Sequence, residues 1–391
     1  MRQWQQHLQQ LCDADMFRQL RVIDGEQTTH VQLNGEGVLM LCSNNYLGLA
    51  NHPAMIEAAL RATRDYGVGS TGSRLISGSM RLHARFEERM ASFKQTEAAL
   101  LFNSGYAANT GILSSLLGPN DLIFSDEYNH ASIIDGCRLS AARTVVYPHA
   151  DVAALESLMI AEVKDRKGRW LIVTDGVFSM DGDCAPLAEL CRLKDRYDSL
   201  LMVDDAHGTG VLGENGRGSS EAQGCLTEID LQMGTLGKGL GGSGAYLAAS
   251  RTIVDTLINR CRPFIFSTSL PPAIPAAAIA ALDIVESQEG ADLRQRLKEN
   301  CLLFTRLLIT GGCDIGVTTT QIVPIMTRTP AATMAAAGQL LDRGLFVQGI
   351  RPPTVADGAC RLRATLMATH DPYELKTAAE AICRVVTKVS V

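Results

Sequence analysis

Short strand-like runs alternate with helical stretches from about residue 50 to residue 250, and this alternation constrains the fold more than any other feature of the chain. Most of the runs between 120 and 203 are rich in Val, Ile and Leu, which is typical of strands buried on both faces of a sheet. The pattern predicts an α/β fold with a mainly parallel sheet flanked by helices. The strand candidates are 98–102, 120–124, 143–147, 169–174, 199–203, 231–235 and 244–248, and helices fit at 105–117, 130–141 and 186–197.

Strands and helices mix in a different order after an alanine-rich helix that we expect to end near residue 287. This later region predicts a smaller α+β domain, with helices at 290–309, 330–342 and 371–388 and strands at 321–326, 345–350 and 360–366. Residues 1–20 have the pattern of a polar helix with a few apolar positions. We therefore expect an N-terminal helix and arm over 1–50, a large domain over 51–287 and a small C-terminal domain over 288–391.

The overall composition excludes several classes of protein. Hydrophobic residues make up 46% and charged residues 20% of the chain, and the net charge is −6. A negative net charge argues against nucleic-acid binding and against binding to acidic membranes. No apolar run approaches the ~20 residues of a membrane span, and the polar N-terminus lacks the apolar core of a signal peptide. We expect a cytoplasmic protein.

Eleven cysteines are scattered along the chain, and the closest pair in sequence is Cys184 and Cys191. No C-x-x-C motif is present, and most of the cysteines lie in apolar runs. Reduced buried thiols fit this distribution better than a metal site or a disulfide framework.

Two glycine-rich segments, 67–72 and 239–244, match the G-x-G-x-x-G pattern of dinucleotide-binding proteins. That motif needs a strand before it and a helix that opens from it. A helix-like segment precedes the first match, and a strand-like segment follows the second. Neither segment therefore predicts a nicotinamide cofactor.

Lys238 lies between glycines in the stretch 235–242, and Asp204 and His207 follow the strand-like run 200–203. A single lysine is most often a solvated surface charge, and a metal site at Asp204 and His207 would need a third ligand that the sequence does not nominate. A lysine on a glycine loop together with an acid at a strand end fits pyridoxal phosphate chemistry. The lysine forms the Schiff base with the cofactor, and the acid pairs with the cofactor's ring nitrogen.

Gly105 and Tyr106 open a helix after a strand-like run, and the free amides at a helix start suit a phosphate. Thr235, three residues before Lys238, offers a hydroxyl to the same phosphate. His130 follows another strand-like run. Its side chain could cap a helix or stack on a cofactor ring, and the sequence leaves these two alternatives open.

Five segments together resemble the α-oxoamine synthases, a group of fold-type I, aminotransferase-like pyridoxal phosphate enzymes. They are 43–49, 69–78, 176–182, 204–210 and 235–238, in the order that is typical of this family and over nearly the whole chain. Asn45 and Asp175 depart from the family, which often has aspartate and glutamate at these positions.

The resemblance implies a role for each candidate residue at the site. Lys238 is the catalytic lysine, Asp204 contacts the ring nitrogen, His130 stacks on the ring, and His207 contacts a ring substituent. The other cofactor contacts that it implies are Gly105, Tyr106, Ser179, Thr235 and Thr268, and the substrate contacts are Arg21, Asn44, Thr354 and Arg363. The family's enzymes are homodimers, so 69–78 and 266–269 are expected near the partner's cofactor.

The segments 349–355 and 360–363, together with Arg21, resemble one branch of the family most closely. That branch joins L-alanine to a pimeloyl thioester, carried by coenzyme A or by acyl carrier protein, and releases CO2 in biotin biosynthesis. Arg363 would bind the alanine carboxylate and Arg21 the far carboxylate of the pimeloyl chain. The alternative is the branch that joins glycine to an acetyl thioester.

Overall fold

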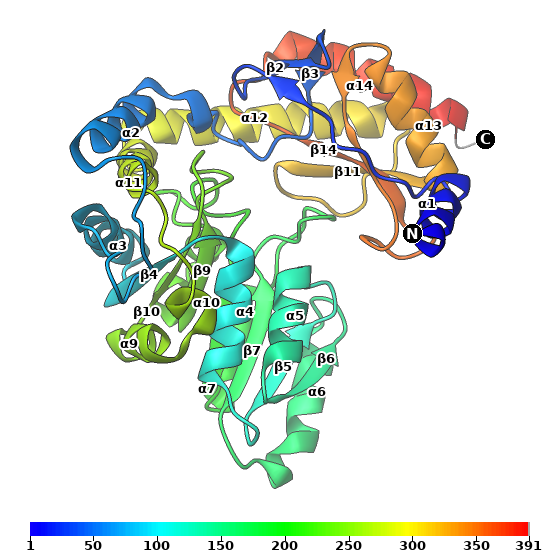
Figure 1. Cartoon of the computed structure of the whole chain (residues 1–391). Coiled ribbons are helices and arrows are strands. Elements are labelled where there is room, and N and C mark those ends of the chain that lie inside the picture. Colours follow the sequence, from blue (N-terminus) through cyan, green and yellow to red (C-terminus); the bar gives the residue numbers. More distant parts are fainter. Residues whose placement is uncertain (390–391) are drawn as a thin grey trace. The chain divides into compact units, whose positions relative to one another are not determined.

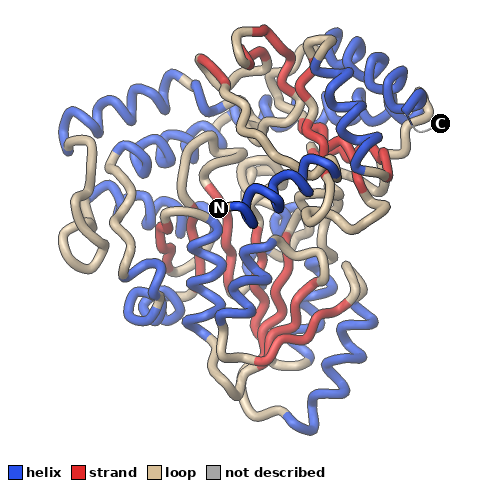
Figure 2. Tube along the Cα trace, turned by 45° about the vertical axis from the view of Figure 1, so that its right-hand side comes forward, coloured by secondary structure: helices blue, strands red, loops and turns tan. Residues whose placement is uncertain are grey.

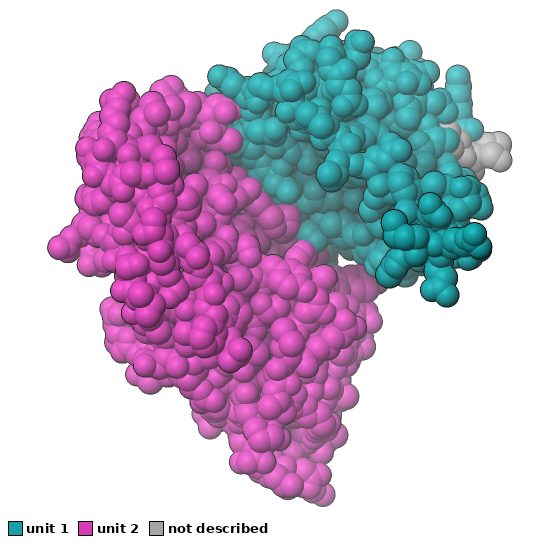
Figure 3. Space-filling view, in the orientation of Figure 1, with its two compact units in different colours: residues 1–48, 179–183, 295–391 teal, residues 49–178, 184–294 magenta. Residues whose placement is uncertain are grey.

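A computed structural model describes residues 1–389, and contacts between Cα atoms divide the chain into two compact units. Unit 1 contains residues 1–48, 179–183 and 295–391, and unit 2 contains residues 49–178 and 184–294 (Figure 3). The N-terminal residues that were expected to form an arm therefore belong to the same unit as the C-terminal residues. The division at 50 and 287 stays a prediction.

Unit 2 is built on a seven-stranded sheet in the order β4-β10-β9-β8-β7-β5-β6 (Figure 1). Strands β6, β5, β7, β8 and β9 run parallel to one another, and β10 is antiparallel to both β9 and β4. This arrangement confirms the predicted α/β fold with a mainly parallel sheet. The strands are β4 (Ala98–Phe102), β5 (Leu122–Asp126), β6 (Arg143–Tyr147), β7 (Trp170–Asp175), β8 (Leu200–Asp204), β9 (Leu231–Thr235) and β10 (Ala245–Ala249).

Helices flank this sheet, as the alternation in the sequence predicted (Figure 2). The helices of unit 2 are α2 (Pro53–Tyr66), α3 (Arg81–Lys94), α4 (Gly105–Leu116), α5 (Ala131–Leu139), α6 (Val152–Glu162), α7 (Leu187–Arg196), α8 (Ser219–Ala222), α9 (Arg251–Arg260), α10 (Arg262–Ile265) and α11 (Ala273–Val285). Short 3-10 helices lie at Leu49–Asn51, Val163–Asp165 and Leu226–Glu228.

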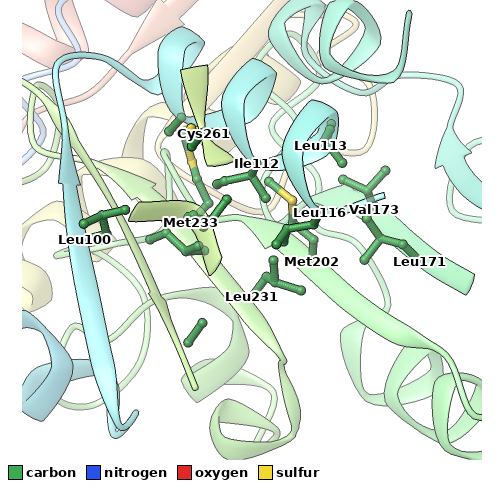
Figure 4. Close-up of a cluster of buried hydrophobic side chains, with 14 of the residues drawn as sticks. Leu100, Ile112, Leu113, Leu116, Leu171, Val173, Met202, Leu231, Met233 and Cys261 are labelled. Carbon is green, nitrogen blue, oxygen red and sulfur yellow. The ribbon is translucent and has the colours of Figure 1, made fainter. Parts of the chain in front are cut away.

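Helix α4 is held against the strands by a buried apolar face. Ile112, Leu113 and Leu116 lie over Met202 and Met233 in the same hydrophobic cluster (Figure 4). Each fully buried side chain of this size stabilises the fold by roughly 1.5–3 kcal/mol. This packing fixes the axis of α4, so the position of its N-terminus at Gly105 is set by the core.

Unit 1 contains two smaller sheets, with the orders β1-β2-β3-β12 and β11-β14-β13. Its strands are β1 (Ile23–Asp24), β2 (His30–Leu33), β3 (Glu36–Met40), β11 (Ile322–Arg328), β12 (Leu345–Phe346), β13 (Gln348–Ile350) and β14 (Cys360–Thr365). Its helices are α1 (Arg2–Asp13), α13 (Pro330–Leu341) and α14 (Pro372–Val389). Helix α12 (Gln288–Thr310) begins in unit 2 and continues into unit 1 from Gln295.

Two predictions for unit 1 were wrong in detail. The helix expected over 1–20 ends at Asp13, because Asp15 takes a left-handed conformation with φ of 56° that a continuing helix cannot accommodate. The single strand expected over 345–350 is two strands, since β12 pairs with β3 and β13 pairs with β14. The hairpin of β2 and β3 was not predicted.

None of the helices described between residues 1 and 389 combines the length and the apolar character needed to span a bilayer.

Candidate active site

The carboxyl ends of β7, β8 and β9 carry Asp175, Asp204 and Thr235 to one edge of the sheet. These strands are parallel neighbours, and Asp175 and Asp204 are paired directly across the β7–β8 ladder. In open α/β sheets, ligands bind at the carboxyl ends of the strands. The fold therefore concentrates the predicted polar residues at the edge where a ligand site is expected.

Asp204 is a buried carboxylate, with 3% of the residue exposed. Its Oδ2 accepts a hydrogen bond from Asn109 Nδ2 at 2.7 Å, and its Oδ1 accepts one from the Ala206 amide at 3.0 Å. No cationic side chain forms an ion pair with Asp204 in the part of the chain that the structure describes. A buried carboxylate is costly without a cation, and a protonated ring nitrogen would supply that cation.

A chain of hydrogen bonds connects Asp204 to His130 through two residues that the sequence did not nominate. Asn109 Nδ2 donates to Asp204 and to Ser132 Oγ, at 2.7 and 2.9 Å. The Ser132 hydroxyl lies 2.7 Å from His130 Nδ1, and the Ser132 amide also donates to that nitrogen. The Ser132 hydroxyl accepts a proton from Asn109, and Nδ1 already accepts one from the Ser132 amide. Nδ1 is therefore an acceptor, and the Ser132 hydroxyl donates to it. The His130 ring proton therefore lies on Nε2.

His130 is both a helix cap and a member of this network, so the two alternatives left open by the sequence are compatible. It is the N-cap of α5, and its own amide donates to Asp175 Oδ2 at 2.7 Å. Burial around the ring lowers the pKa of His130, the Asp204 carboxylate opposes this effect, and the positive charge of Lys238 adds to it. The imidazole is accordingly neutral at physiological pH, which suits a ring that stacks on another flat ring.

Asp175 is fully buried between His130 and Asp204. Burial raises the pKa of the Asp175 carboxyl well above its usual range, and the negative charge of Asp204 raises it further.

Lys238 follows β9 on a turn rich in glycine, and its side chain is half-buried. Its Nζ lies 2.8 Å from His207 Nε2, and His207 is 5% exposed. The turn is compact because Gly241, at φ of 64°, approaches the backbone of Leu49 and Ala50 so closely that a Cβ there would clash. The predicted lysine and histidine are thus brought into direct contact.

The start of α4 and the end of β9 form a cradle suited to a phosphate. Ser104 caps the helix by accepting from the Ala107 amide, and the first amides of an α-helix lack intrahelical acceptors. A Cβ on Gly105 would lie 2.8 Å from Thr235 Cγ2, so only glycine leaves this approach open. Thr235 Oγ1 is buried and has no hydrogen-bond partner in the described chain. An orphaned hydroxyl beside a helix N-terminus fits a phosphate oxygen.

Two other predicted cofactor contacts lie near this cradle in unit 2. Tyr106 is half-exposed, and its hydroxyl donates to Asp135. Thr268 accepts a hydrogen bond from Asn103 Nδ2 at its carbonyl oxygen, at 2.7 Å. These contacts place both residues beside the start of α4.

The predicted substrate arginine, Arg363, belongs to unit 1 and is 7% exposed. Its Nε donates to the Ser179 carbonyl oxygen at 2.5 Å, and both Nη atoms lie 3.4 Å from Asn44 Oδ1. The Tyr46 hydroxyl also donates to Asn44 Oδ1, at 2.9 Å. The structure thus brings Arg363, Asn44 and Ser179 together as one group. The guanidinium has only neutral oxygen partners in this group, and it can take a carboxylate in a bidentate fashion.

Arg21 and Thr354 also lie in unit 1, and both side chains are exposed. The Arg21 guanidinium carbon lies 5.2 Å from the centre of the Phe346 ring. The Thr354 amide donates to the Arg351 carbonyl oxygen at 3.1 Å. Among residues 1–389, no hydrogen bond or ion pair joins either side chain to the group around Arg363.

Comparison with known proteins identifies the family. The sequence model of one protein family, aminotransferase class I and II, matches residues 36–382. An 8-amino-7-oxononanoate synthase of Geotalea daltonii is 56% identical over 391 residues, which cover 100% of this chain and 99% of that protein. The chain belongs to the 8-amino-7-oxononanoate synthase family.

Solved structures agree with this assignment. A serine palmitoyltransferase from S. paucimobilis, solved with bound PLP and myriocin, matches with a TM-score of 0.92 and 30% identity, over 99% of this chain and 97% of that one. The 8-amino-7-oxononanoate synthase of Francisella tularensis matches with a TM-score of 0.77 and 29% identity, over 90% of this chain and 99% of that one. The predicted fold-type I architecture and the predicted class of pyridoxal phosphate-dependent acyltransferase are confirmed.

The two departures from the family pattern are accommodated in different ways. Asp175 still reaches the His130 amide with its shorter side chain. Asn45 is buried at 7% exposure and donates through Nδ2 to the Gln27 carbonyl oxygen at 3.0 Å. Neither substitution removes a residue of the site.

Proposed function

We propose that this protein is a pyridoxal phosphate-dependent acyltransferase that condenses L-alanine with a pimeloyl thioester. The products are 8-amino-7-oxononanoate, CO2 and the free thiol of the carrier. The observation that carries the proposal is the arrangement at the edge of the unit 2 sheet. Three features there match the three ends of one cofactor. Within the described part of the chain, a buried carboxylate has no cation beside it and a buried hydroxyl at a helix start has no hydrogen-bond partner, and a lysine contacts a histidine.

The polarity of each of these residues suits the part of pyridoxal phosphate that it would contact. Thr235 Oγ1, which has no partner among the described residues, and the first amides of α4 would hold the phosphate. Asp204 would hold a proton on the ring nitrogen, with its own orientation fixed by Asn109. When bound, the cofactor withdraws electrons from the α-carbon of the amino acid and so stabilises a carbanion there.

Proton transfer at the α-carbon falls to Lys238. Its amine would take the α-proton of alanine, and His207 at 2.8 Å would orient the amine through a hydrogen bond. Loss of CO2 after the carbon–carbon bond forms leaves a second carbanion, and Lys238 would return the proton to that carbon. The neutral His130 ring would exclude water from one face of the site.

Arg363 would bind the alanine carboxylate, with Asn44 and the Ser179 carbonyl oxygen holding the guanidinium in a fixed plane. Arg21 would contact the far carboxylate of the pimeloyl chain. Its exposed position suits a contact with the end of a long substrate. Thr354 would contact the same acyl chain.

The test compares condensation of L-alanine with pimeloyl-CoA against condensation of glycine with acetyl-CoA, by following release of the free thiol. We expect turnover with the first pair and at most a trace with the second. Turnover with the second pair alone would refute the proposed reaction. The same assay with pimeloyl-acyl carrier protein identifies the preferred carrier.

We further propose that the enzyme is a homodimer in which 69–78 and 266–269 approach the partner's cofactor. The two segments are joined to each other, because Ser70 Oγ donates to the Ser269 carbonyl oxygen at 2.7 Å and the Ser269 amide donates to the Gly72 carbonyl oxygen. They also expose large apolar side chains. Ile76 is 84% exposed and Phe266 is 70% exposed. Such a patch favours a protein partner.

A further inference from the structure

A buried ion pair lies next to Asp204, outside the residues described so far. Lys94, the last residue of α3, has no exposed side-chain surface, and its Nζ lies 3.6 Å from Asp205 Oδ2. Nζ also donates to the Arg217 carbonyl oxygen at 2.5 Å and lies 6.0 Å from the centre of the Tyr246 ring. Lysine is almost never fully buried unless it is paired. The pair therefore calls for an explanation.

The Asp205 carboxylate joins the end of β8 to two other parts of unit 2. It accepts hydrogen bonds from the Ser219 amide at 3.1 Å and from the Ser219 hydroxyl at 2.7 Å. The Thr209 hydroxyl lies 3.2 Å from Oδ2 and 2.7 Å from the Tyr246 hydroxyl on β10. The carboxylate thus clamps the turn after β8 onto the start of α8.

The backbone of Asp205 fixes the same turn from its other side. The Asp205 amide donates to the Met233 carbonyl oxygen on β9 at 2.8 Å, and the Asp205 carbonyl oxygen accepts from the Thr209 amide at 3.0 Å. This turn contains His207, whose Nε2 lies 2.8 Å from Lys238 Nζ. Asp204 directly precedes it. The residues that would meet the cofactor's ring are therefore carried on a turn whose geometry depends on Asp205.

We propose that Lys94 and Asp205 are positioning residues for the cofactor site. The ion pair keeps the 205–209 turn in place, so that the Asp204 carboxylate faces the ring nitrogen and His207 stays against Lys238. The role is one of positioning, because the contacts of both side chains are to the turn and its neighbours rather than to Lys238 or Asp204. The inference rests on the proposed function for the identity of the cofactor.

The charges of Lys94 and Asp205 depend on each other. Burial lowers the pKa of Lys94 and raises the pKa of Asp205, and in each case the partner's charge opposes the effect of burial. Without Lys94, the Asp205 carboxyl would be uncompensated and would tend to take up a proton. A protonated oxygen is a poorer acceptor for the Ser219 amide and hydroxyl, so the clamp on the turn would loosen.

The test compares Lys94→Met with Lys194→Met, both as full-length protein loaded with pyridoxal 5'-phosphate. Lys194 is 13% exposed and pairs with Asp230 at 3.3 Å, and Asp230 accepts from the Leu201 amide near the amino end of the same strand, β8. Removing Lys194 therefore disturbs β8 at the end away from Asp204. The readouts are the dissociation constant for pyridoxal phosphate, the pH midpoint of the bound cofactor's visible absorbance and the Tm.

We expect Lys94→Met to weaken cofactor binding at least about tenfold, the change that follows when a hydrogen bond to a charged group loses its geometry. The pH midpoint should also move, because the carboxylate at the ring nitrogen is displaced. Lys194→Met should lower the Tm and leave both cofactor readouts as in the wild type.

Asp205→Asn provides a second route, since it keeps the shape of the side chain and cannot leave a cavity. It should also weaken cofactor binding. If Lys94→Met does not fold, this variant tests whether the ion pair positions the cofactor site. A lower Tm with wild-type cofactor affinity and midpoint would show that the pair only supports the fold, and would overturn the proposal. Failure of the condensation assay with normal cofactor binding would refute only the proposed reaction. A wild-type protein that does not bind pyridoxal phosphate would refute both proposals.

Discussion

The chemistry of this site depends on a small number of contacts between single residues. The contact between Lys238 and His207 and the hydrogen-bonded chain from Asp204 to His130 were found only in the folded protein. Sequence motifs nominated Lys238, Asp204 and His207 because the residue types suit the cofactor. Asn109 and Ser132 gave no such signal, since a buried amide or hydroxyl in a helix resembles any other polar residue of a helix start.

Replacing Lys238 with Ala should abolish turnover and leave the fold intact. The expected loss is on the order of 10³-fold or more, because an amine that transfers the α-proton is removed together with the covalent link to the cofactor. Thiol release from pimeloyl-CoA with L-alanine measures the loss, and circular dichroism checks the fold. Turnover within a few-fold of the wild type would reject the assigned role of the lysine.

His370 in unit 1 should make the protein less stable at acidic pH. It is 4% exposed, its Nδ1 accepts from the Met367 amide, and its Nε2 lies 2.9 Å from the Met40 carbonyl oxygen. Burial lowers its pKa from 6.5 to about 4. Between these two values the unfolded chain binds more protons than the folded chain, so stability falls as the pH falls.

The expected loss between pH 6.5 and 4 is about 3 kcal/mol, from 1.36 kcal/mol for each pKa unit. Urea unfolding at a series of pH values measures it. His370→Gln should give a shallower dependence on pH in this range, although the variant is less stable at neutral pH. An unchanged slope in the variant would show that another group titrates.

At the scale of the secondary-structure elements, the site is made where α4 and β9 meet. The position of α4 is set by its apolar face on the sheet, and Gly105 lets the end of β9 approach the helix start. The sequence predicted both elements to within one residue at each end. It could not show that Thr235 Oγ1 would be buried without a partner in the described chain.

Thr235→Val should separate cofactor binding from stability. Loss of a phosphate contact should weaken pyridoxal phosphate binding by roughly tenfold, and removal of a buried hydroxyl that makes no bond should leave the Tm of the apoprotein unchanged or slightly higher. Fluorescence titration and thermal unfolding measure the two effects.

The matched control is Thr327→Val in unit 1, where the buried hydroxyl is hydrogen-bonded to Thr333 Oγ1 at 2.5 Å. That variant should lower the Tm by removing a bond that is made, and it should leave cofactor affinity unchanged. A lower Tm for Thr235→Val with normal cofactor affinity would contradict the phosphate assignment.

At the scale of the whole molecule, the joined segments 69–78 and 266–269 predict a dimer. Sedimentation equilibrium should give twice the chain mass, and Ile76→Glu should shift the protein toward monomers with lower turnover. The substitution places a charge where the partner would exclude water, while the isolated chain already exposes the position. Ile160→Glu on α6, at a position that is 58% exposed, is the control and should stay dimeric. A dimer that survives Ile76→Glu with full activity would argue for a different interface.

The sequence by itself determined the order and type of most elements in unit 2, because buried parallel strands need continuous apolar runs and their helices need the 3.6-residue period. It also determined the class of cofactor, because few chemistries need a lysine on a glycine loop together with an acid at a strand end. In unit 1 it could not show that residues 345–350 divide between two sheets, since the pairing partner of a short strand is chosen by distant residues.

Only the tertiary structure decided which polar residues touch. Asn109 reaches Asp204 across 95 positions of sequence, and Lys94 reaches Asp205 across more than a hundred. Such contacts leave no periodic pattern, because each needs only one residue of the right type at the right place. The local physics of the chain therefore predicted the sheet and the candidate lysine, and the packing of α3, α4 and β8 decided how the site is held together.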